Sequence, residues 1–121
     1  MTSGEFRRLA LRFPEAVEGV HQGHADFRVG GRVFASLGYP SDECAVVLLS
    51  AQDQDLIVRD HPGAFSPAAG KWGANGSTVI TLDALEAGSA GAVAAALEAA
   101  WRKRAPKRLL AALEQRSGDA V

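Results

Sequence analysis

The stretch Ala64–Leu82, AFSPAAGKWGANGSTVITL, carries the signals that decide the fold. Pro67–Gly70 is typical of a turn, and Trp72–Gly76, with its Asn-Gly pair, predicts a second turn. Ser77–Leu82 follows with β-branched residues, which favour a strand. A strand that follows two turns, in a chain with helical patterns on both sides, indicates a mixed fold with an antiparallel sheet.

The clearest hairpin lies upstream, at Asp26–Leu37. We predict a three-residue turn, Gly30–Arg32, because this turn brings the apolar residues of both strands onto one face. The residues of that buried face are Phe27, Val29, Val33, Ala35 and Leu37. The opposite face then carries Arg28 and Phe34.

The remaining segments give an α+β fold, an antiparallel sheet packed by helices on one side. A further strand is predicted at Cys44–Leu49, while Glu15–Gly23 is interpreted as a connection. Apolar spacing, capping residues and prolines predict helices at Ser3–Phe13, Ala51–Asp60, Ala90–Arg104 and Pro106–Leu113. We expect one domain over residues 1–121, with about 114–121 as a flexible tail.

Composition restricts the classes of function. The formal net charge is −1, so attraction to nucleic acid requires a local basic patch. Cys44 is the single cysteine and lies in an apolar run, which predicts a small buried hydrophobe. The chain lacks an apolar segment of membrane-spanning length, and we expect a cytoplasmic monomer without a membrane partner.

The strongest candidate site is the basic segment Arg102–Arg108. Five cations in seven residues could neutralise several phosphates of DNA. The alternative interpretation is a solvated helix end, where cations interact favourably with the C-terminal end of the helix dipole. The expected nucleic-acid-binding residues are Arg28, Arg32, Lys71, Arg102, Lys103, Arg104, Lys107 and Arg108.

Trp72 and Asn75 are candidates for a ligand pocket. Trp72 could stack on a base or line a cleft, or it could plug the sheet edge with its indole bonded to a loop carbonyl, which is the interpretation we favour. Trp101 continues a helical apolar stripe and is expected in the core.

Enzymatic and metal functions have little support in the sequence. His21, His24 and Asp26 have a spacing that could hold a metal, but no clear further ligand accompanies them, and we expect no metal or cofactor. No nucleophile motif or phosphate-binding loop is present, and we expect a protein that is not an enzyme.

Four segments together resemble the MmcQ/YjbR family of small bacterial proteins. They are Phe27–Ala35, Phe65–Ala69 with Lys71-Trp-Gly73, Gly76–Leu82 and Ala100–Arg108. The resemblance implies a frataxin-like (CyaY-like) α+β fold with a double-wing shape, and a DNA-binding function without defined catalytic residues.

This chain departs from the family pattern at two places. It has Val20–His24 where many relatives carry an aromatic residue, and Ser77 where a tryptophan is common. The leading hypothesis is a non-catalytic DNA-binding module that uses Arg102–Arg108 and the Gly30-Gly31 hairpin to read phosphate and shape. The alternative is a small-ligand or protein-binding module with a cleft near Trp72. An enzyme of unrecognised type is the weaker alternative.

Overall fold

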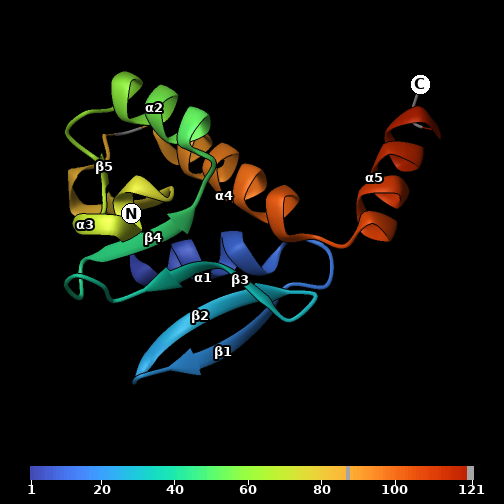
Figure 1. Cartoon of the computed structure of the whole chain (residues 1–121), viewed down its shortest axis with the longest axis horizontal. Helices are drawn as coiled ribbons and strands as arrows, with labels where there is room; N and C mark the ends of the chain where they lie inside the picture. The colour runs from blue at the N-terminus through green and yellow to red at the C-terminus, as the bar shows by residue number, and fades with distance from the viewer. Residues whose placement is uncertain (87, 120–121) are drawn as a thin grey trace.

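The computed structural model describes residues 1–86 and 88–119 and shows an α+β fold around one six-stranded sheet (Figure 1). The strand order is β1-β2-β3-β4-β6-β5, and every neighbouring pair is antiparallel. The strands are β1 (Val17–His21), β2 (His24–Val29), β3 (Arg32–Leu37), β4 (Cys44–Leu48), β5 (Phe65–Pro67) and β6 (Ser77–Thr81).

Helices α1 (Ser3–Leu11) and α4 (Ala90–Arg104) cover one face of this sheet. The other helices are α2 (Ala51–Asp60), α3 (Gly70–Ala74) and α5 (Lys107–Asp119), with a 3₁₀ turn, η1, at Leu82–Ala84. In Figure 1, α1 and α4 lie over the sheet, α2 packs beside α4, and α5 projects beyond the end of α4. The expected sheet with helices on one side is therefore confirmed. Within the described residues, no helix has the length and apolar character that crossing a membrane requires.

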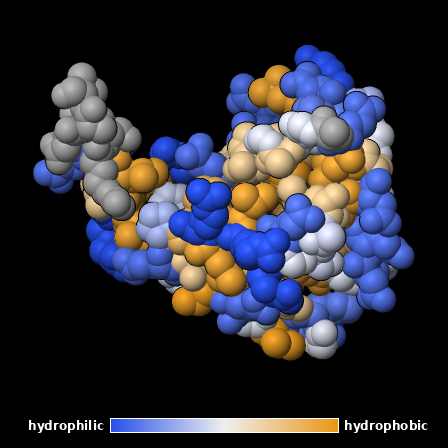
Figure 2. All heavy atoms as spheres, turned by 180° about the vertical axis from the view of Figure 1, so that it is seen from behind, coloured by the Kyte–Doolittle hydropathy of each residue, from blue (hydrophilic) through white to orange (hydrophobic). Residues whose placement is uncertain are grey.

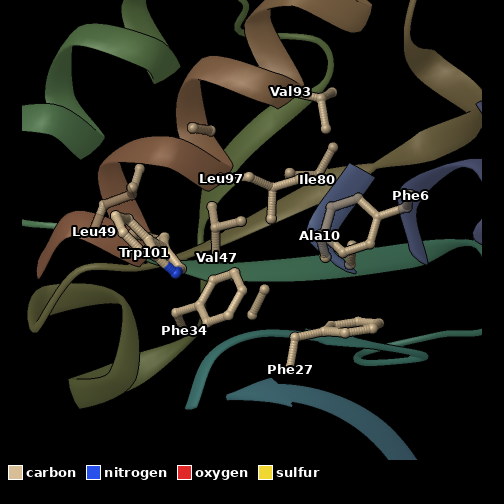
Figure 3. Close-up of a cluster of buried hydrophobic side chains, with 14 of the residues drawn as sticks. Phe6, Ala10, Phe27, Phe34, Val47, Leu49, Ile80, Val93, Leu97 and Trp101 are labelled. Atoms are coloured by element: carbon tan, nitrogen blue, oxygen red, sulfur yellow. The ribbon is translucent and has the colours of Figure 1, made fainter. Parts of the chain in front are cut away.

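The core fills the space between α1, α4 and the sheet (Figure 3). Aromatic side chains dominate it, and Phe6, Phe27, Phe34 and Trp101 are fully buried. Trp101 extends the apolar stripe of α4, as expected, and its Nε1 donates a hydrogen bond to the Pro14 carbonyl at 3.0 Å. Cys44 is buried on the other face of the sheet beside Val46 and Val79, which confirms its prediction as a small hydrophobe.

The predicted register of the β2–β3 hairpin is wrong at its tip. Gly30 and Gly31 alone form the turn, both with positive φ (59° and 78°), and Val29 pairs with Arg32. A bulge at Phe34 then restores the expected pairing of Phe27 with Ala35. Because of the bulge, Phe34 enters the core, whereas Val33 lies on the open face of the sheet beside its partner Arg28.

Three other segments differ from expectation. Residues 17–21, expected within a connection, form the edge strand β1, and residues 70–74, expected to turn, form the short helix α3. The last helix continues to Asp119, so residues 114–119 of the expected flexible tail are helical, and residues 120–121 lie outside the described residues.

Candidate functional site

The hairpin tip meets the junction between α4 and α5. A Cβ atom added at Gly30 would lie 2.9 Å from Pro106 Cγ, so the two segments are in van der Waals contact. Arg32 follows the tip and pairs with Val29, whose side chain is in the core, so Arg32 lies on the helix side of the sheet. We call Arg32, Arg104, Lys107 and Arg108 the basic corner.

Several cations of Arg102–Arg108 already have partners. Arg108 donates to both oxygens of Glu15, at 2.8 and 2.9 Å, and this hydrogen bonding raises the pKa of Arg108 and lowers that of Glu15. Lys103 Nζ donates to the Leu49 carbonyl at 3.0 Å, and Arg102 lies 3.8 Å from Glu98. The segment is therefore less free to bind phosphate than its sequence indicates.

The other candidate cations are spread over the molecule. Among the side chains of residues 1–86 and 88–115, no carboxylate lies at ion-pair distance from Arg32, Arg104 or Lys107. Lys71 lies on α3, at the opposite end of the molecule from the α4–α5 junction (Figure 1). Seen from behind, hydrophilic and hydrophobic groups alternate over the surface and form no single hydrophilic face (Figure 2).

A groove of about 520 Å³ crosses the sheet face that the helices leave open. Its floor is apolar and comes from Val33, Val46 and Leu48 on successive strands. Tyr39 lies on one side, after β3, and Trp72 lies on α3. Such a volume is within the usual range of ligand sites.

Trp72 is exposed over 73% of its surface, which contradicts the favoured interpretation of a buried plug. Among the described residues, no acceptor lies within hydrogen-bond distance of its indole. Its place on the groove agrees with the alternative interpretation, a residue that lines a cleft. Asn75, the other expected pocket residue, ends α3 as its C-cap and is not part of the groove lining.

Gln54 on α2 holds α3, and with it Trp72, against the sheet. Its Nε2 is buried and lies 3.0 Å from the Gly73 carbonyl, 3.1 Å from the Ser77 carbonyl and 3.2 Å from Thr78 Oγ1. A side chain at Gly73 would overlap the Ala68 carbonyl, so only glycine permits this approach. Gln54 could not be identified from the sequence, because one polar residue on a short helix is normally exposed.

Asp26 and Arg28 form a fixed pair beside the groove floor. Asp26 is 3% exposed and accepts from Arg28 Nε at 2.9 Å and from Nη2 at 2.8 Å, which raises the pKa of Arg28. Gly19 on β1 leaves the space for this pair, since a Cβ there would lie 2.8 Å from Asp26 Oδ1. Among the described side chains, no acceptor lies at hydrogen-bond distance from Arg28 Nη1, which therefore has protons to donate to a ligand.

The histidines of the considered metal site lie in a hairpin. His21 and His24 pair across the β1–β2 turn, and both line the groove. Asp26 is engaged by Arg28 and is therefore not available as a simple third ligand. In the described part of the chain, no three His, Cys, Asp or Glu side chains form a group that could hold a metal ion.

Comparison with known proteins gives a family and a fold. A family model described as YjbR matches residues 11–103. The crystal structure of a Deinococcus radiodurans protein with the domain DUF419 is similar, with a TM-score of 0.67 and 17% sequence identity. That similarity covers 83% of this chain and 75% of the other. No curated protein matches the sequence.

Proposed function

We propose, from the fact that this chain belongs to the YjbR family, that it is a non-catalytic DNA-binding module whose basic corner holds the phosphate backbone. The observation that carries the proposal is the contact of Gly30 with Pro106. It joins the hairpin tip to the α4–α5 junction, and so places Arg32 on the same corner as Lys107. Two segments that are far apart in sequence thereby supply cations to one surface.

The side chains of the basic corner are suited to binding phosphate rather than to recognising base sequence. Arginine presents a planar fork of donors and lysine a mobile point charge, and both are common phosphate ligands. Arg108 adds a further guanidinium, although Glu15 competes for it. Because the whole chain has a net charge of −1, long-range attraction is weak and binding depends on these local contacts.

The test is fluorescence anisotropy of a labelled, mixed-sequence duplex at low and moderate salt. Each phosphate contact contributes about 0.9 to the slope of log affinity against log salt, so Arg32→Glu/Lys107→Glu is expected to lower the slope by about two. Affinity should fall by at least about tenfold at low salt. The matched control is Arg8→Glu/Arg59→Glu, which changes the net charge by the same amount at two residues, on α1 and α2, that do not belong to the basic corner.

Equal losses in the two double variants would mean that total charge, and not the corner, determines binding. Absence of binding by the wild-type protein at low salt, both to this duplex and to its separated strands, would reject the DNA-binding function itself.

The groove supports a second candidate function, a small-ligand or protein-binding module. The observation that favours it is the exposure of Trp72 beside an apolar floor. Such a module would be insensitive to charge reversal at the corner and would lose binding on Trp72→Ala. A ligand screen by thermal shift, on the wild-type protein and on that variant, tests it.

A further inference from the structure

We propose that the groove on the open sheet face binds unpaired bases, so that the preferred nucleic acid is single-stranded. This inference rests on the proposed function, because the basic corner would hold the backbone of the same strand. It adds a second surface and a class of nucleic acid that phosphate contacts alone do not determine.

The first argument is the aromatic content of the groove. Trp72 is 73% exposed and Tyr39 is 58% exposed, and both line the groove around an apolar floor. Exposed aromatic rings beside an apolar surface are what single-strand-binding proteins use to stack on bases, whatever the base. A duplex stacks its bases on one another and therefore cannot present their faces to these rings.

The second argument is a hydrogen-bond donor that is already oriented. Asp26 holds the guanidinium of Arg28, a residue that lines the groove, through Nε and Nη2, so that Nη1 keeps its protons for another acceptor. Carbonyl oxygens and ring nitrogens on the edge of an unpaired base are matching acceptors. Because the Asp26 carboxylate neutralises the charge of the guanidinium, Arg28 can donate a hydrogen bond to a neutral base edge as well as to a phosphate.

The third argument is continuity between the groove and the basic corner. Val33 lines the groove and pairs with Arg28, and the preceding residue, Arg32, lies on the other face of the sheet, at the corner. Gly30 contacts Pro106, but a Cβ added at Gly31 would meet no atom within 4 Å, so a nucleic-acid strand that leaves the corner can reach the groove by passing the hairpin tip at Gly31. One nucleic-acid strand can therefore contact both surfaces.

Intrinsic fluorescence reports on the groove directly. The chain has two tryptophans, and Trp101 is fully buried whereas Trp72 is exposed. Titration with an unlabelled, mixed-sequence single strand should quench Trp72, while the matched duplex should leave the emission nearly unchanged. Trp72→Phe should remove the quenching and retain most of the affinity, because phenylalanine still stacks.

Affinity is measured in parallel by anisotropy with labelled single strand and duplex. Trp72→Ala should weaken single-strand binding about tenfold and leave duplex binding unchanged, in keeping with the loss of one stacked base. Leu56→Ala is the matched control, since Leu56 is a 49% exposed apolar residue on α2, outside the groove. Thermal melts of all variants check that each one folds.

The outcomes separate this inference from the proposed function. If the duplex binds through the corner but Trp72→Ala leaves single-strand affinity unchanged, the inference is wrong and the proposed function stands. If neither nucleic acid binds at low salt, both are wrong. A titration with adenosine then shows whether the groove accepts an isolated base, which would leave it as the ligand site of the second candidate function.

Discussion

Replacement of Gln54 by alanine should destabilise the protein far more than its position on a short helix indicates. Gln54 Nε2 has two protons and lies near three buried oxygens, on Gly73, Ser77 and Thr78. Gln54→Ala removes both protons. The two main-chain carbonyls then lose a donor at a site that the side chain had closed to water.

The expected loss follows from these contacts. A typical intramolecular hydrogen bond contributes about 1 kcal/mol net. The Gly73 and Ser77 carbonyls keep a backbone donor each, from Gly76 N–H and Ala68 N–H, so neither is left unpaired. Two lost bonds therefore predict a fall in the free energy of unfolding of about 2 kcal/mol. The loss should also release α3, which carries Trp72, because Gln54 joins α2 to the Gly73 carbonyl.

Urea unfolding followed by far-ultraviolet circular dichroism measures this loss, with Gln52→Ala as the control. Gln52 is an exposed residue of the same helix, so the two substitutions share the gain in helix propensity and differ in the buried contacts. If both variants unfold within about 0.5 kcal/mol of each other, the buried hydrogen bonds do not hold α3 as argued.

Three further outcomes are expected. Gly73→Ala should lower the thermal midpoint strongly, because its Cβ would overlap the Ala68 carbonyl, whereas Gly91→Ala on α4 meets no atom within 4 Å and should stabilise by about 0.5–1 kcal/mol in the same melts. Glu15→Gln should raise duplex affinity and increase the salt slope by about one, since it releases Arg108; an unchanged slope in anisotropy titrations would contradict this role. Arg108 lowers the pKa of Glu15, so the contribution of the pair to stability is present above the ordinary carboxyl pKa and is lost as the pH falls through the lowered value. NMR titration should show the Glu15 pKa rising in Arg108→Gln, and an unmoved pKa would refute the coupling.

Elements with strong local signals could be predicted from the sequence. The bounds of α2 and α4 agree with the prediction, because capping residues, prolines and apolar spacing define both helices without reference to the rest of the chain. The edge strand β1 and helix α3 were missed. β1 is mostly exposed and has no apolar alternation, and α3 contains two glycines, so tertiary contacts and not local preference determine both.

The candidate site could be predicted only in part. The resemblance and the cations pointed to the hairpin and to Arg102–Arg108, and the structure joins these two segments through Pro106. The partners of the cations, such as Glu15 for Arg108, are distant in sequence, so no local sequence pattern predicts these ion pairs. Exposure of Trp72 was equally unpredictable, because it depends on the short helix that Gln54 holds against the sheet.

The bulge at Phe34 reverses the odd–even rule that assigns side chains to the two faces of β3. In the C-terminal half of β3, the odd-numbered Ala35 faces the helices. At the bulge, the even-numbered Phe34 faces them instead. Deletion of Phe34 would therefore remove the bulge, leave Arg32 opposite Val29 and Val33 opposite Arg28, and take one aromatic side chain out of the core. The extra residue thus lets β3 give two consecutive side chains, Phe34 and Ala35, to the core, while Arg32 and Val33 keep to opposite faces of the sheet.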